Sequence, residues 1–233
     1  YLIEEKESKK LYGAKPSIRE YKSEQEKNDF YQKILLYSKV QNPAILPLYG
    51  FSFNDFDGAP YPTIITEFMI NHSIRDYVKK AHCYPSSRKY PMLLGIAKGM
   101  NYLHSHQIIH RKLKPENILL DQFYFPHISD FYTSKIPDSI DSIKSNNMDI
   151  FVYMAPEILQ KKSITHKADV YSFAIIAYEL ITESKPFHNI KDIEKLKNFV
   201  TKNKRPDLSK VTSQCLIDLI SKCWSSDPNE RPE

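Results

Sequence analysis

The stretch HRKLKPENILL, at residues 110–120, says more about the fold than any other part of the sequence. It is followed by DFY at residues 130–132 and by MAPE at residues 154–157. All three lie in a region, residues 107–162, with little hydrophobic periodicity and many polar side chains. A polar region of that length inside a compact domain is usually functional rather than a simple connection. We therefore expect the chemistry of the protein to be concentrated here.

The segments on either side of this region predict strands first and helices afterwards. Residues 1–11, 46–53 and 63–68 are typical of extended strands, and residues 23–40 carry apolar side chains at helical spacing. Apolar residues recur every three or four positions in four later segments, at residues 93–103, 170–181, 190–200 and 216–224. This order predicts an α+β fold, with a small β-rich part followed by a larger helical part.

The composition is that of a folded globular protein and excludes several classes. The 233 residues are 41% hydrophobic and 26% charged, which rules out wholesale disorder. No apolar run approaches the roughly 18 residues of a membrane span, and Lys and Arg form no dense block interleaved with aromatic residues, so we expect no membrane and no nucleic-acid partner. Three scattered cysteines favour a reducing, cytoplasmic location. The 5 glycines argue against a glycine-rich phosphate loop within the chain.

Together these motifs resemble the catalytic loop, the magnesium motif and the end of the activation segment of the protein kinases. Residues 12–15 (YGAK), 169–173 (DVYSF) and 223–232 (CWSSDPNERP) extend the resemblance over nearly the whole chain. The motif KPEN at residues 114–117 is similar to the one found in serine/threonine kinases, and the motif at residues 223–232 is similar to that of the tyrosine-kinase-like branch. The resemblance implies a two-lobed protein-kinase fold, with the N-lobe at residues 1–68 and the C-lobe at residues 69–233. It also implies a glycine-rich loop before the first residue and a further helix after the last.

The resemblance implies that much of a nucleotide site is retained. In the family, a lysine grips the phosphates of ATP, while an aspartate and an asparagine bind Mg²⁺. These positions hold Lys15, Asp130 and Asn117 here, so ATP and Mg²⁺ are the implied cofactors and Asn117 and Asp130 the implied metal ligands. Lys114 is implied to serve beside Asn117 in the catalytic loop. The residues implied to surround the adenine are Ala14, Thr66, Glu67, Phe68, Met69 and Leu119.

Two positions at which the family carries a carboxylate hold lysine in this sequence. The catalytic aspartate is replaced by Lys112, whose ammonium cannot accept a proton. General-base help is worth about 10²–10⁴ in rate. The family's spacing puts Lys33 where a helix glutamate would hold Lys15, although Glu26, two helical turns earlier, is an alternative partner. Two ammonium groups 4 Å apart repel by about 4 kcal/mol at an effective dielectric of 20, so Lys15 and Lys33 should not face each other unless an anion lies between them.

Two further replacements agree with lost chemistry, whereas the residues that brace the fold survive. Ile150 stands where the family has a threonine hydroxyl, and Tyr132 stands where it has the glycine after Asp-Phe. The resemblance implies that Glu157 and Arg231 form a buried ion pair and that Asp169 accepts hydrogen bonds from the catalytic-loop backbone. It also implies stacking of three rings, those of Tyr37, His110 and Phe131.

These observations favour a pseudokinase that acts as an ATP-binding or allosteric scaffold for other signalling proteins, including an active kinase. Two alternatives stay open. One is an active, atypical serine/threonine kinase that transfers the γ-phosphate of ATP to protein hydroxyls. The other is a binding module that takes no nucleotide.

Overall fold

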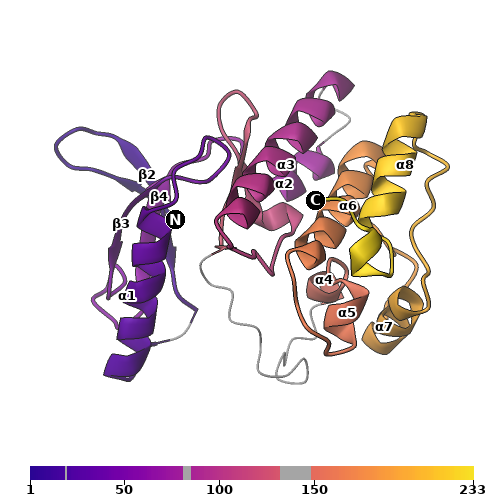
Figure 1. Ribbon diagram of the computed structural model, residues 1–233. Helices are drawn as coiled ribbons and strands as arrows, with labels where there is room; N and C mark the ends of the chain where they lie inside the picture. The colour runs from indigo at the N-terminus through magenta and orange to yellow at the C-terminus, as the bar shows by residue number, and fades with distance from the viewer. Residues whose placement is uncertain (19, 81–84, 132–147) are drawn as a thin grey trace.

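The computed structural model describes residues 1–18, 20–80, 85–131 and 148–233 (Figure 1). Its N-terminal part is a four-stranded sheet with one long helix, and its C-terminal part is mainly helical. The strands are β1 Leu2–Glu4, β2 Leu11–Pro16, β3 Leu48–Ser52, β4 Thr63–Glu67, β5 Ile118–Leu120 and β6 Pro126–Ile128. The helices are α1 Glu24–Ser38, α2 Ile74–Lys79, α3 Lys89–Ser105, α4 Met148–Phe151, α5 Pro156–Leu159, α6 Lys167–Thr182, α7 Ile193–Thr201 and α8 Gln214–Cys223.

The N-terminal sheet is antiparallel and has the strand order β1-β2-β4-β3. Its register places Lys15 of β2 opposite Ile64 of β4. Helix α1 begins with a capping box, in which the Ser23 hydroxyl accepts from the Glu26 N–H and the Glu26 side chain accepts from the Ser23 N–H. The apolar stripe of α1 packs inward, so that the helix lies beside the sheet (Figure 1).

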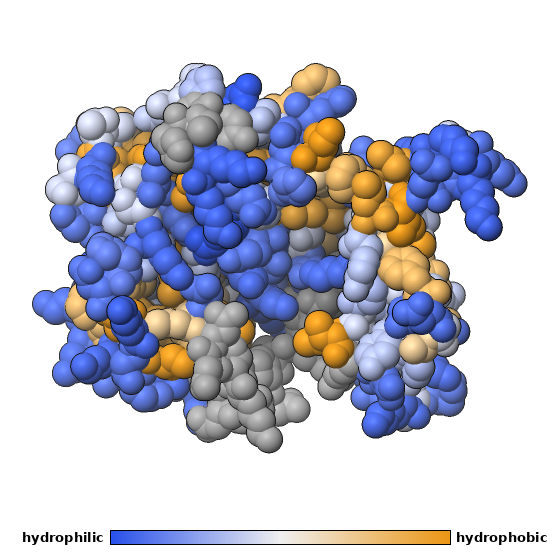
Figure 2. Space-filling view, turned by 180° about the vertical axis from the view of Figure 1, so that it is seen from behind, coloured by the Kyte–Doolittle hydropathy of each residue, from blue (hydrophilic) through white to orange (hydrophobic). Residues whose placement is uncertain are grey.

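Helix α6 is the centre of the C-terminal part. Most of its side chains are buried, with Leu180, Ile175 and Ile176 fully so, and the buried set includes the charged Asp169 and Glu179 among mainly apolar residues. A helix that is apolar on all sides needs protein around it, and α3 and α8 pack against α6 while α2 touches it. The face of the molecule seen in Figure 2 is mostly hydrophilic, with scattered hydrophobic residues and one connected run of them at the upper right. The apolar side chains are therefore gathered mainly in the interior.

The two parts are joined by direct backbone contacts beside the β5–β6 hairpin. The N–H of Leu46 donates to the carbonyl of Ile128 at 3.0 Å, and the N–H of Ile128 donates to the carbonyl of Ala44 at 2.8 Å. Helix α3 comes close to this point at Gly99, where an added Cβ would lie 2.7 Å from the Ile128 side chain. A residue without a side chain at position 99 lets α3 pack against this junction.

The α+β class and the order of strands before helices are confirmed. The description of residues 107–162 as lacking regular structure was wrong in part, because β5, β6, α4 and α5 lie within it. Each of these elements has only three or four residues, too few for a periodic signal. The lobe boundary at residue 68 stays a prediction, although it falls between β4 and α2.

Candidate functional site

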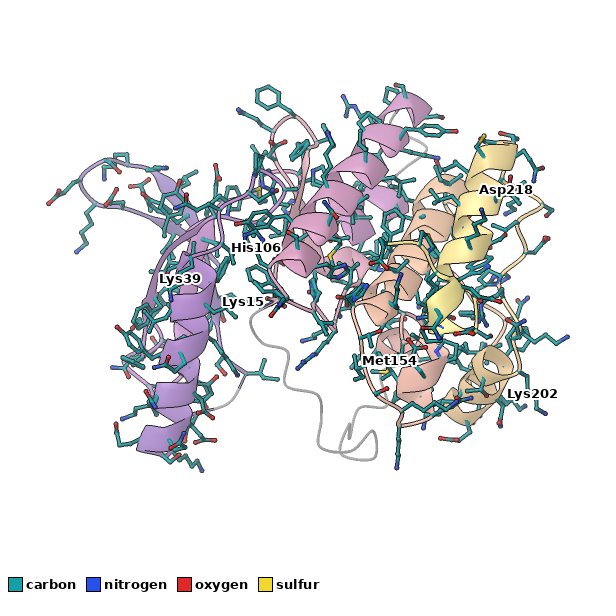
Figure 3. The ribbon with its side chains drawn as sticks, viewed as in Figure 1. Lys15, Lys39, His106, Met154, Lys202 and Asp218 are labelled. Atoms are coloured by element: carbon teal, nitrogen blue, oxygen red, sulfur yellow. The ribbon has the colours of Figure 1, made fainter. Side chains whose placement is uncertain are left out.

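A cleft of 610 Å³ lies between the sheet and the helical part. Figure 3 shows Lys15 at this junction, on the side of the sheet that faces the helical part. The cleft brings together every residue predicted to contact a nucleotide: Ala14, Lys15, Thr66, Glu67, Phe68, Met69, Leu119 and Asp130. Because these residues come from β2, β4, the segment after β4, β5 and the segment after β6, the cleft depends on the whole fold.

Pairing between β2 and β4 forms one wall of the cleft. Gly13 lies opposite Thr66 in the register, and an added Cβ at Gly13 would be 3.3 Å from the Thr66 hydroxyl oxygen. Side chains alternate along a strand, so Gly13 shares a face with Lys15. The sequence-based prediction missed Gly13, although strand alternation from Lys15 was the signal that could have identified it.

Lys15 and Asp130 form an ion pair in this cleft. The Asp130 side chain is 5% exposed, while that of Lys15 is 63% exposed. Only the carboxylate of this ion pair is therefore buried. Burial raises the pKa of Asp130, but the charge and hydrogen bond of Lys15, with the charge of Lys112, outweigh it and leave this pKa below its ordinary value. Asp130 has a left-handed backbone with φ of 66°, a conformation that residues other than glycine hold mainly where the surrounding structure requires it.

Lys112, Lys114 and Asn117 lie beside the cleft and not among the residues that line it. The Asn117 side-chain amide donates to the carbonyl of Lys112 at 2.9 Å and thereby fixes the loop between them. The carbonyl of Asn117 accepts from the N–H and the hydroxyl of Ser129, at 2.8 and 3.0 Å. Asn117 is thus linked to the residue before Asp130. The loop is held together, and Lys112 is part of it.

The Lys112 ammonium stands in an electropositive setting. Partial desolvation lowers the pKa of Lys112; the charge of Asp130 opposes this shift, and the charges of Lys15 and Lys114 add to it. A second, small cavity of 40 Å³ is lined by Lys112, Lys114 and Ile150, among others. The apolar Ile150 therefore borders the loop at the position where the resemblance implied a hydroxyl. Tyr132, the other predicted departure, lies outside the described residues.

Lys114 faces an acidic residue that belongs to a network the sequence-based prediction missed. The Lys114 ammonium is 3.8 Å from one carboxylate oxygen of Glu116, and Arg75 of α2 donates to the other oxygen at 2.8 Å. Arg75 also pairs with the buried Glu179 of α6, to which the Tyr153 hydroxyl donates at 2.6 Å. No spacing in the sequence connects these residues, because they come together through helix packing.

The predicted bracing contacts are present. Arg231 donates two hydrogen bonds to the Glu157 carboxylate, at 2.7 and 2.8 Å, and both side chains are buried. Asp169 accepts from the backbone N–H groups of His110 and Arg111, each at 2.8 Å. These contacts fix the segment around residues 154–157 and the loop at residues 110–112.

Two of the three predicted rings, those of Tyr37 and Phe131, are in contact, and they join the N-terminal and C-terminal parts. The ring centroids of Tyr37 and Phe131 are 4.9 Å apart in an edge-on arrangement. His110, predicted as the third ring, is completely buried, and its backbone N–H donates to Asp169. Its place in the stack stays a prediction. The Tyr37–Phe131 contact ties α1 to the residue after Asp130.

The anion beside Lys15 does not come from α1. Glu26 accepts from the backbone N–H groups of Lys22 and Ser23, at 2.9 and 3.3 Å, so its carboxylate caps the start of the helix. The alternative in which Glu26 holds Lys15 is therefore wrong. Among the residues that the structure describes, Asp130 is the carboxylate paired with Lys15. The carboxylate paired with Lys15 is thus the residue that the resemblance implied as a metal ligand.

The cleft carries groups whose chemistry suits a nucleotide. It offers Lys15 for phosphates and apolar walls for a base, whereas Mg²⁺ is bound through carboxylate, phosphate and water oxygens. The Asp130 carboxylate is already bonded to an ammonium group. Within residues 1–18, 20–80, 85–131 and 148–233, no group of three or more His, Cys, Asp or Glu side chains is arranged to hold a metal ion.

Comparison with known proteins agrees with this geometry. The family model described as "Protein tyrosine and serine/threonine kinase" matches residues 3–233. The chain belongs to this kinase family. It is 33% identical over 220 residues to the serine/threonine/tyrosine-protein kinase HT1 of Arabidopsis thaliana, an alignment that covers 94% of this chain and 55% of that protein.

Two further kinases are similar to this chain, and the alignment covers only part of each of them. The chain is 32% identical to the serine/threonine-protein kinase STY17 of Arabidopsis thaliana over 88% of this chain and 35% of that protein. It is 37% identical to the RGS domain-containing serine/threonine-protein kinase A of Dictyostelium discoideum over 72% of this chain and 15% of that protein. The chain therefore spans about half or less of the curated kinases that it matches. No helix in the described ranges has the length and apolar character needed to cross a bilayer.

Proposed function

We propose that this kinase-family domain is a pseudokinase that binds ATP and acts as an allosteric scaffold, with weak or absent phosphotransfer. The observation that carries the proposal is Lys112, a cation where the reaction needs a proton acceptor. A small shift of the loop cannot bring another residue to the position of Lys112. The side chain of Asn117 binds the carbonyl of Lys112, and Asp169 binds the backbone N–H groups of the two residues before it.

The remaining machinery supports nucleotide binding more than catalysis. Phosphoryl transfer relies on positioning and charge neutralisation by the protein, and Lys15 in the cleft provides one positive group for phosphates. The family generally uses ATP together with Mg²⁺. In this chain Lys15 is bonded to Asp130, and Ile150 replaces the threonine that would contact the catalytic loop. Binding groups are thus retained while the groups that act on the substrate hydroxyl are replaced.

The partners that suit this role are other signalling proteins, including an active kinase. A domain that binds a nucleotide without turning it over can change the stability of its own fold, since a ligand at 100 times its Kd adds about 2.7 kcal/mol to the folded state. Nucleotide occupancy would then favour one conformation for a partner.

A radiolabelled phosphotransfer assay tests the proposal. The wild-type domain and its Asp130→Ala variant are incubated with γ-labelled ATP, Mg²⁺ and a generic protein substrate, and incorporation is counted. We expect equal, background incorporation in both. Turnover by the wild type that disappears in Asp130→Ala would overturn the proposal, because a contaminating kinase would be unaffected by the substitution.

The second candidate is an active, atypical serine/threonine kinase, favoured by the retention of Lys15, Asn117 and Asp130 near one cleft. The assay above separates it from the pseudokinase. The third candidate, a module that takes no nucleotide, is separated by thermal unfolding with and without ATP. An unfolding temperature that does not move with saturating ATP would favour this module.

A further inference from the structure

The carboxylate of Asp130 forms an ion pair with one ammonium group, that of Lys15, and the charge of Lys112 also acts on it. Lys112 stands at a position that is acidic in the family, so the charge there is changed by two units. The carboxylate expected to collect divalent cations therefore has a lysine of the protein itself as its partner.

The other implied metal ligand is held in place through its amide nitrogen. The side-chain N–H of Asn117 donates to the carbonyl of Lys112 at 2.9 Å, which fixes the asparagine against the loop that carries Lys112 without using the amide oxygen, the atom that would bind a metal. Mg²⁺ demands near-octahedral oxygen ligands and usually takes one or two carboxylates together with phosphates and water. Four acidic residues line this cleft: Asp130 is paired with Lys15, Glu116 with Arg75 and Asp76 with Ser73, while Glu67 lies at the end of β4, in the segment expected to face the adenine.

We propose that the cleft binds a nucleoside polyphosphate without a divalent cation, the ammonium groups of Lys15 in the cleft and of Lys112 in the loop beside it taking the place of the metal. This inference rests on the proposed nucleotide-binding function and specifies how that site neutralises phosphate charge. An ammonium group is a compact point charge with three donors, and both lysines have flexible stems that let them follow the phosphates. When a polyphosphate enters, Lys15 keeps its ion pair with Asp130 and donates its remaining N–H groups to phosphate oxygens.

The direction of the metal effect follows from the same charges. Free Mg²⁺ chelates the phosphates and reduces the negative charge that Lys15 and Lys112 would bind. Added Mg²⁺ should therefore leave nucleotide affinity unchanged or weaken it, in contrast to a site in which the metal bridges phosphate and carboxylate. Replacing Lys112 by aspartate removes one ammonium and adds a carboxylate, so it should turn the site into one that prefers the metal complex.

Calorimetric titration with ATP tests this inference, with thermal unfolding as a second readout. Wild type, Lys112→Asp and Lys191→Asp are titrated at constant ionic strength, once with EDTA and once with excess MgCl₂. Lys191 is an exposed lysine just before α7, away from the cleft, so Lys191→Asp makes the same charge change remotely. For wild type and Lys191→Asp, we expect Kd in EDTA to equal or fall below Kd in Mg²⁺. For Lys112→Asp, we expect binding at least about tenfold tighter with Mg²⁺ than with EDTA.

Each outcome decides a separate point. Wild-type binding that requires Mg²⁺ would overturn the inference and leave the nucleotide-binding function intact. Binding of ATP in neither condition would overturn the function and the inference together. A Lys112→Asp variant that keeps its unliganded unfolding temperature and behaves like wild type in both titrations would remove Lys112 from the proposed site.

Discussion

In this kinase-family chain, the contacts that brace the C-terminal part are retained, whereas residues of the loop beside the cleft are replaced. We call this loop the phosphate end, because the proposed nucleotide would place its phosphates beside it. The bracing contacts include the Arg231–Glu157 pair and the bonds from the catalytic-loop backbone to Asp169, all with ordinary hydrogen-bond lengths. At the phosphate end, Lys112 replaces a carboxylate and Ile150 replaces a hydroxyl. The difference shows that a scaffold can be maintained in full while its chemical groups are exchanged.

The two regions are close together, which makes the comparison informative. Asp169 holds the backbone of His110 and Arg111, and the next residue is Lys112. A loop held this firmly presents whatever side chain it carries at a defined place. The replacement of the proton acceptor is therefore a change of chemistry at a fixed position and not a loss of local structure.

The largest expected effect comes from breaking the brace at its buried ion pair. Arg231→Met leaves the Glu157 carboxylate buried without its bidentate partner, and such a change costs about 3–5 kcal/mol in the free energy of unfolding. The cost is measured by urea unfolding at pH 7. We expect the variant to unfold at a much lower urea concentration than wild type.

The matched comparison for that variant is Lys112→Met, the same apolar replacement of a cation at the phosphate end. The residue is exposed overall, so its loss should change unfolding free energy by no more than about 0.5 kcal/mol. A cost for Lys112→Met similar to that for Arg231→Met would show that Lys112 braces the fold, and the contrast between the two regions would then be false.

The second prediction weakens the brace at the catalytic loop. Asp169→Asn keeps the shape of the side chain but turns one acceptor into a donor, so the N–H of either His110 or Arg111 loses its partner in any orientation of the amide. An unsatisfied buried donor costs about 1–3 kcal/mol. Urea unfolding measures the loss, and amide hydrogen exchange at residues 110–112 should rise.

Asp192→Asn is the control for this change. Asp192 caps α7 by accepting from the Lys195 N–H at 2.7 Å, and asparagine caps a helix about as well as aspartate. We expect little change in its stability. If both variants lost the same amount, general charge removal rather than the lost acceptor at Asp169 would explain the effect.

Several of the contacts in these predictions could be predicted from the sequence alone. The Glu157–Arg231 pair and the acceptor role of Asp169 were predicted because each residue lies in a motif whose order and spacing match the family. The nucleotide-facing residues were predicted for the same reason, and the structure collects them in one cleft. Motif spacing works where a residue's role is tied to its neighbours in the chain.

The parts that were missed depend on packing between distant segments. Arg75 reaches Glu116 and Glu179, which are far apart in sequence, and neither motif spacing nor periodicity relates the three. The partner of Lys15 was open for a similar reason, because Glu26 satisfies the end of its own helix and leaves Asp130 to supply the anion. Short elements such as β5 and β6 are stabilised by pairing with each other and not by a local pattern.

The smallest expected effect concerns the ion pair of Asp149, the residue just before the replacement Ile150. Asp149 pairs with Lys185 at 2.7 Å, and the hydrogen bond from Lys185 is the main cause of the lowered pKa of Asp149. Because the pKa of Asp149 is lower in the folded state than in the unfolded state, where it is about 3.9, the ionised carboxylate stabilises the fold at pH values above about 3.9. This stabilisation disappears as the pH falls through the pKa of the folded state. Both side chains are more than a third exposed, so solvent screening limits the effect.

Lys185→Ala should therefore reduce the free energy of unfolding by about 0.2–1 kcal/mol at pH 7, and the difference from wild type should shrink as pH falls below 4. Urea unfolding at a series of pH values measures it, with Lys195→Ala as control because that side chain has no ion pair with any described residue. A difference that stayed constant down to pH 3 would show that Lys185 stabilises the chain through its packing and not through Asp149. A difference that shrinks as expected would mean that the segment carrying Ile150 is held by a weak surface contact, in contrast to the buried pair that holds Glu157.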